Sequence, residues 1–130
     1  DLAAAIGGGH GVRRILDDHA RHLQLAHEMG VTLLLGTDAG SMGVKHGHAV
    51  FEEIDRFVEA GLSLVAALRA ATSAARSHFG LASPVLSKGA EFDALLLDAS
   101  PFDDTAHFQR PLAVWASAPG KDLESNPAPA

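Results

Sequence analysis

Three stretches of the chain carry hydrophobic residues at every third or fourth position, which is the spacing of one face of a helix. These stretches predict helices over most of 12–29, 49–60 and 64–79. Gly30, Gly61 and Gly80 follow them, and glycine is the residue that most often ends a helix. Ser63 stands just before the third stretch, where its hydroxyl can accept a hydrogen bond from the first turn.

The run Val31 to Leu35 has a different pattern. It is made of β-branched and aliphatic residues without a regular polar alternation. Such a run is typical of a strand buried on both faces of a parallel sheet, so we expect a strand at 31–36. Shorter strands are expected near 94–98 and 112–117. A helix followed by a buried strand is one step of an α/β fold.

The residues directly after this run carry candidate chemistry. Gly36, Thr37, Asp38 and Gly40 follow the expected strand. Ligands of α/β folds bind at the carboxyl ends of parallel strands, so a carboxylate there is a candidate functional group. Asp and Gly are also ordinary turn residues, and Asp38 as a simple turn residue is the alternative.

Composition narrows the class of protein. The chain has 130 residues, enough for one domain or less, and 47% hydrophobic with 20% charged residues is typical of a globular protein. The absence of cysteine excludes disulfides and thiolate metal sites and fits a reducing compartment, so we expect a cytoplasmic protein. The net charge of −6 argues against nucleic acid or an acidic membrane as partner. No apolar run is long enough to cross a bilayer.

Several histidines could in principle bind a metal. His46 and His48 form an H-x-H pair, and His19 and His22 lie one turn apart on the first expected helix. One interpretation is a separate metal site made of the HGH segment at 46–48 and another histidine. For His19 and His22 we favour an ordinary solvated helix face, because acidic and basic residues are mixed around them.

The order of motifs resembles the carboxyl-terminal part of the amidohydrolase superfamily, and most closely its imidazolonepropionase-like and prolidase-type members. The resemblance covers about residues 20–117. It is carried by GTDAG at 36–40, His46-Gly47, Glu52, AGLS at 60–63, ALRAAT at 67–72 and KGAEFDALLLDASPFDD at 88–104. Phe92 departs from the pattern, since the family usually has alanine there.

The resemblance implies a fold and a division of the chain. Residues 1–82 would be the carboxyl-terminal part of a (β/α)8 TIM barrel, with the last barrel strand and its helices. Residues 83–117 would add short strands of a small accessory β-structure, and 118–130 would be a disordered tail. Because such barrels need about 250 residues, we expect this chain to be a fragment. Its partner would be the missing amino-terminal part of the barrel or further copies of itself.

The resemblance also implies an activity. It points to a metal-dependent hydrolase of carbon–nitrogen bonds in small amide substrates, using one or two divalent ions, with zinc favoured. Asp38 would be metal ligand and general base, and His46 would bind substrate. The remaining ligands are not in this chain, so we expect it to be inactive alone. The alternative is a non-catalytic α/β interaction domain that needs a partner chain.

Overall fold

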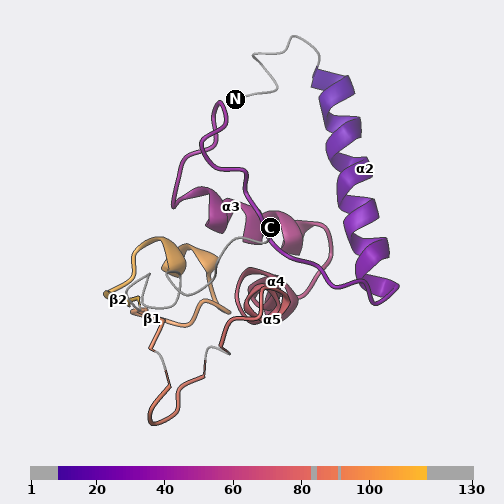
Figure 1. The fold of residues 1–130 in the computed structure, drawn as a ribbon. Helices are drawn as coiled ribbons and strands as arrows, with labels where there is room; N and C mark the ends of the chain where they lie inside the picture. The colour runs from indigo at the N-terminus through magenta and orange to yellow at the C-terminus, as the bar shows by residue number, and fades with distance from the viewer. Residues whose placement is uncertain (1–8, 83–84, 91, 117–130) are drawn as a thin grey trace, which may run out of the picture.

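The structure is a computed structural model that describes residues 9–82, 85–90 and 92–116 (Figure 1). Four α-helices, one 3-10 helix and two short strands are present in these ranges. They are α2 (Gly9–Glu28), α3 (Ala49–Glu59), α4 (Leu64–Ala71), α5 (Ser73–His78), β1 (Ala94–Leu96), η1 (Thr105–Gln109) and β2 (Ala113–Trp115). The described part therefore combines helices with a two-stranded antiparallel sheet. The tail expected over 118–130 lies outside the described residues.

The ends of the helices follow the local sequence. Gly30, Gly61 and Gly80 adopt φ values of +77°, +96° and +68°, which L-residues with a side chain rarely adopt. The helices before them end at these glycines, as the sequence predicts. At the start of α4, the Ser63 side chain accepts a hydrogen bond from the Ala66 N–H, which confirms the expected N-cap.

The helix expected over 64–79 is interrupted at Thr72. This residue has φ −131° and ψ −90°, and its hydroxyl donates a 2.6 Å hydrogen bond to the Leu68 carbonyl oxygen. A threonine hydroxyl that binds the carbonyl four residues back competes with the helix backbone and often bends it. The single predicted helix is therefore two helices, α4 and α5.

The segment Val31–Leu35 is extended but is not a strand, so this sequence-based prediction is wrong for the structure. The side chains of Leu33, Leu34 and Leu35 are only half-buried, and Val31 is 52% exposed. The Leu35 N–H donates to the Ala70 carbonyl of α4 at 3.1 Å, instead of to another strand. A strand needs a neighbour to complete its ladder of hydrogen bonds, and none of the described residues provides one here.

The helix α3 is the centre of the packed region. It contacts α2, α4 and η1, and Figure 1 shows it between α2 and the β1–β2 pair. The buried cluster consists of Ile54, Phe57, Ala60, Leu62, Ala67 and Ala70. Ala20 and Leu23 of α2 and Leu33 and Leu35 pack against it from the side. The small alanine side chains of α4 let the backbone of the segment before α3 approach closely. The hydrogen bond from the Leu35 N–H to the Ala70 carbonyl oxygen forms at this close approach.

The carboxyl-terminal strands are tied to the helices by side chains. Leu95 of β1 pairs with Val114 of β2 in an antiparallel register. Phe92 packs against Trp115 with ring centroids 5.3 Å apart, which gives this departure from the family pattern a structural role. Arg76 of α5 binds the Asp93 carboxylate at 2.9 Å, so Asp93 anchors the strand to α5.

Large apolar side chains remain exposed on several elements. Met29 is 72% exposed, Leu25 50% and Val114 62%. The fully covered core is correspondingly small. Within the described residues, no helix is both long and apolar enough to cross a membrane.

Candidate functional site

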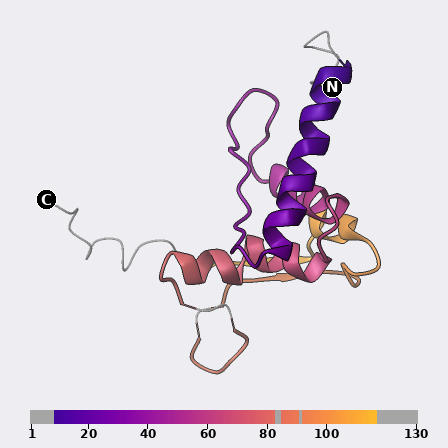
Figure 2. The same ribbon diagram turned by 90° about the vertical axis from the view of Figure 1, so that its right-hand side faces the viewer.

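Asp38 lies at the start of a loop that joins the extended segment to α3. Figures 1 and 2 show that this loop projects away from α4 and α5. Asp38 has a φ of +49°. In the part of the chain that the structure describes, it is the only residue other than glycine with a positive φ. Asp tolerates this left-handed conformation better than most residues, because its short side chain can form local hydrogen bonds. The loop thus holds the carboxylate in an exposed position, directly after the extended segment.

Ser41 donates two hydrogen bonds to Asp38. Its hydroxyl donates a hydrogen bond to Asp38 Oδ2 at 2.9 Å, and its backbone N–H donates to the Asp38 carbonyl at 3.3 Å. Sequence analysis did not single out Ser41. The available signal was the D-x-x-S spacing in a loop punctuated by glycine, because Ser and Asp three residues apart often share a turn.

The His46 side chain folds back onto Gly40, at the beginning of the same loop. Gly40 has φ +103°, and a Cβ atom added there would lie 3.1 Å from His46 Nε2. The imidazole therefore packs on the bare backbone two residues after Asp38. The loop is closed by hydrogen bonds from the Gly40 N–H to the Val44 carbonyl at 3.1 Å and from the Val44 N–H to the Ser41 carbonyl at 3.0 Å. The two sequence-predicted site residues, Asp38 and His46, are thus brought to one loop.

The Gly40→Ala substitution is expected to displace His46. In the complete hydrolase that the sequence predicts, with His46 as substrate-binding residue, we expect it to raise KM by up to about tenfold, the effect of ~1.4 kcal/mol of lost binding, while kcat changes less. Gly43→Ala is the matched control, since Gly43 has φ +86° but nothing within 4 Å of the added Cβ. Equal KM values for the two variants would show that the His46 contact has no part in binding.

His48, His19 and His22, the other histidines considered from sequence, do not join this loop. His48 is the residue directly before α3. Its Nδ1 lies 3.5 Å from Glu52 Oε1, so its side chain points along that helix. His19 and His22 are exposed on α2, as expected for a solvated face. No group of three or more His, Cys, Asp or Glu side chains in the described ranges is placed to hold a metal. The HGH segment therefore does not form a metal site with other described residues.

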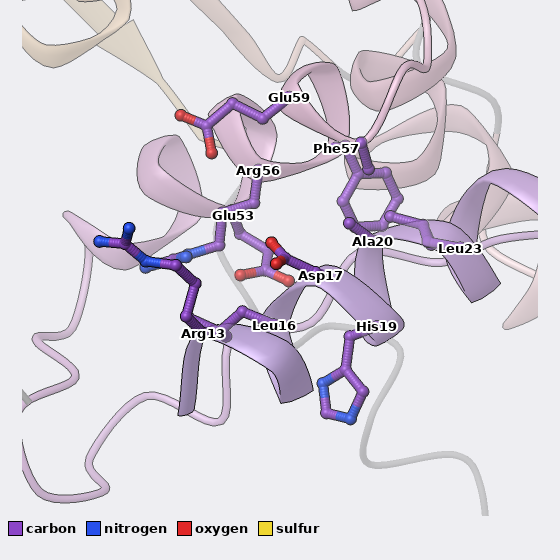
Figure 3. A pocket seen from close by; sticks show the side chains of 11 residues that line it. Arg13, Leu16, Asp17, His19, Ala20, Leu23, Glu53, Arg56, Phe57 and Glu59 are labelled. Atoms are coloured by element: carbon purple, nitrogen blue, oxygen red, sulfur yellow. The ribbon is translucent and has the colours of Figure 1, made fainter. Parts of the chain in front are cut away.

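A groove of about 670 Å³ lies between α2 and α3, away from the Asp38 loop. Figure 3 shows Arg13 and Asp17 of α2 facing Glu53 and Arg56 of α3 across it. Leu16, Ala20 and Leu23 of α2 also line it, opposite Phe57. Neither Asp38 nor His46 is among its lining residues. The groove is therefore a gap between α2 and α3, and it is separate from the candidate catalytic residues.

A second carboxylate–histidine pair lies near the sheet. His107 Nδ1 is 2.8 Å from Asp98 Oδ1, and this pair links η1 to the end of β1. Sequence analysis did not single out either residue of this pair. The two partners are nine positions apart, which is not the spacing of a helix turn or a tight turn, so the pairing was not predicted.

Comparison with known proteins gives a consistent picture. The model of the amidohydrolase family matches residues 4–120 of the chain. Ochratoxinase from Aspergillus niger, recorded also for two strains of this fungus, is 32% identical over 120 residues. The match covers 89% of this chain and 24% of the relative, so the chain spans about a quarter of the length of these relatives. No solved structure matches the chain.

Proposed function

This chain belongs to the amidohydrolase family, and from that premise we propose that it supplies the catalytic Asp38 of a metal-dependent hydrolase acting on carbon–nitrogen bonds. The observation that carries the proposal is the Asp38 loop. An extended apolar segment ends in an exposed carboxylate, which is held in a left-handed conformation by its own loop. Sparsely populated backbone conformations cluster at functional sites, and this one holds the carboxylate exposed at the end of the segment.

The proposed fold is a (β/α)8 barrel to which residues 1–82 contribute the carboxyl-terminal part. In it, Val31–Leu35 would pair with neighbouring strands supplied by residues outside this chain. Among the described residues this segment pairs with no strand, and together with the exposed apolar side chains of α2 this supports the arrangement. Residues 83–117 would form part of the accessory β-structure, for which β1 and β2 are the described strands.

The metal would need ligands beyond those described here. Asp38 offers hard oxygen atoms, which suit a divalent ion, but the described residues provide no complete group of ligands around it. Zinc is our proposed ion, and the remaining ligands would come from the rest of the barrel. When bound, such an ion lowers the pKa of water toward neutrality and polarises the scissile carbonyl group.

Asp38 would move the proton of the reaction. A carboxylate accepts a proton from water as that water attacks the carbonyl carbon, and then donates it to the leaving nitrogen. Asp38 is exposed, and among the described hydrogen bonds only one reaches its side chain. It therefore keeps accessible lone pairs for this transfer.

His46 would bind the substrate beside Asp38. Its imidazole is exposed and rests on Gly40, so its ring nitrogens can reach a polar group of a ligand at the loop. The substrate class that we propose is a small molecule with an amide or related carbon–nitrogen bond. One relative is named for ochratoxin, which makes ochratoxin a useful assay substrate alongside cyclic amides and acyl-amino acids.

The test compares this chain alone with the complete barrel enzyme. We expect the chain alone, supplied with zinc or manganese, to show no turnover, because one carboxylate cannot complete the metal centre. The complete enzyme should turn over an amide substrate and lose that activity when a chelator removes the metal. Robust metal-dependent turnover by the chain alone would contradict the proposed division of ligands. A complete enzyme that neither binds metal nor hydrolyses any amide would favour the non-catalytic interaction domain.

A further inference from the structure

We infer that Ser41 is a positioning residue for Asp38, which sets the direction in which the carboxylate presents its reactive lone pairs. This inference rests on the proposed function, because it gives Ser41 a role only if Asp38 is the catalytic carboxylate. The central observation is the 2.9 Å hydrogen bond that the Ser41 hydroxyl donates to Asp38 Oδ2. A hydrogen bond to an ionised acceptor is stronger than one between neutral groups.

The backbone brings Ser41 back toward Asp38. The left-handed φ of +49° at Asp38 and the φ of +103° at Gly40 reverse the chain within three residues. The Ser41 N–H then reaches the Asp38 carbonyl oxygen at 3.3 Å. Ser41 is therefore connected to Asp38 twice, once through backbone groups and once through side chains.

Ser41 is itself held in place by the loop. Its carbonyl oxygen accepts a hydrogen bond from the Val44 N–H at 3.0 Å, and the Val44 carbonyl accepts one from the Gly40 N–H at 3.1 Å. On the other side of Asp38, the Thr37 Oγ1 accepts from the Ala39 N–H at 3.2 Å. These bonds fix both ends of the turn, so the Ser41 hydroxyl acts from a defined position.

An exposed carboxylate has particular need of such a partner. Asp38 and Ser41 are both exposed, so neighbouring side chains do not lock the Asp38 rotamer by packing. Catalytic groups must be held within about 0.5 Å of the productive geometry, and second-layer hydrogen bonds usually do this. The Ser41 bond uses one of about four lone-pair positions of the carboxylate. Oδ1 and one position on Oδ2 remain available for a ligand and a proton.

The hydroxyl of Ser41 is assigned no part in bond breaking. It donates a hydrogen bond to Asp38 Oδ2 and keeps its proton, and this is the one hydrogen bond of the Ser41 hydroxyl among the described residues. The expected consequences of removing it are therefore misorientation of Asp38, slower chemistry and weaker metal binding, with the substrate contact at His46 unchanged.

The test uses Ser41→Ala and Ser41→Thr in the complete enzyme. For Ser41→Ala we expect kcat to fall about tenfold, because a hydrogen bond to a charged group is worth at least that factor, with KM within about twofold. We also expect the affinity for Zn²⁺, measured by chelator competition, to fall about tenfold, as for other partners of metal ligands. Ser41→Thr retains a hydroxyl and should restore both values to within about threefold.

Three results would decide the matter. Unchanged kcat and Zn²⁺ affinity in Ser41→Ala would overturn the inference, even if its melting temperature falls, because that pattern indicates a purely structural residue. Equal losses in Ser41→Thr and Ser41→Ala would also overturn it. Asp38→Asn serves as the reference variant: if it remains active, the proposed function itself fails, whatever Ser41 does. If it is inactive and Ser41→Ala is normal, only the positioning role fails.

Discussion

Asp38→Asn in the complete enzyme is expected to lower kcat by about 10²–10⁴, the usual effect of removing a general base. The amide keeps the size of the side chain and one oxygen, but it loses the negative charge and the basic oxygen. Asn also tolerates the left-handed φ of +49° at this position, so folding should be unaffected. Steady-state kinetics and a melting curve of the purified variant measure the two effects separately.

The histidines provide the controls for this substitution. His48→Ala and His22→Ala should leave kcat within a few-fold of the unmodified enzyme, because both side chains are exposed and lie outside the Asp38 loop. His46→Ala should raise KM more than it lowers kcat. Near-normal kcat in Asp38→Asn with metal bound would show that another group accepts the proton.

Phe57→Ala is expected to lower the free energy of unfolding of the chain by about 3–5 kcal/mol, the usual loss for a buried phenylalanine. Phe57 is 5% exposed and packs in the buried cluster where α3, α4 and the extended segment meet. The expected loss is large beside the ~5–15 kcal/mol total stability of a typical domain, so the variant should unfold at a much lower urea concentration. Urea denaturation followed by far-UV circular dichroism measures this change.

Phe102→Ala is the matched control for the stability experiment. It removes the same type of side chain at a position that is 63% exposed. It should therefore change the midpoint of urea denaturation little. If both variants lose the same stability, the buried cluster around Phe57 does not hold the helices together. The comparison separates the effect of the packed position from the effect of losing a phenylalanine.

The exposed apolar surface has a direct bearing on the proposed barrel. In the described part of the chain, half of the six residues of the buried cluster are alanines, while Met29, Leu25 and Val31 are half or more exposed. These three side chains lie on α2 and the segment that follows it. Burial of apolar area is the main favourable term in folding, so we expect this surface to be covered in the complete enzyme.

The sequence by itself determined the features that depend on neighbouring residues. Gly30, Gly61 and Gly80 end helices because only glycine adopts their positive φ without strain, and Ser63 caps α4 through an adjacent N–H group. The predicted helix over 49–60 agrees with α3, whose apolar face faces the core. The order of motifs from GTDAG at 36–40 to the segment 88–104 also indicated the amidohydrolase family, which the family model confirms.

The tertiary structure alone decided the features that need a distant partner. Val31–Leu35 has the composition of a buried strand, but strand formation requires a second strand, and the described residues place the α4 backbone beside it instead. The pairs Arg76–Asp93 and Asp98–His107 join residues separated by 17 and 9 positions, and no local pattern marks such partners. The direction of the Asp38 carboxylate depends on the turn that returns Ser41 to it, so sequence alone could name the catalytic candidate but could not orient it.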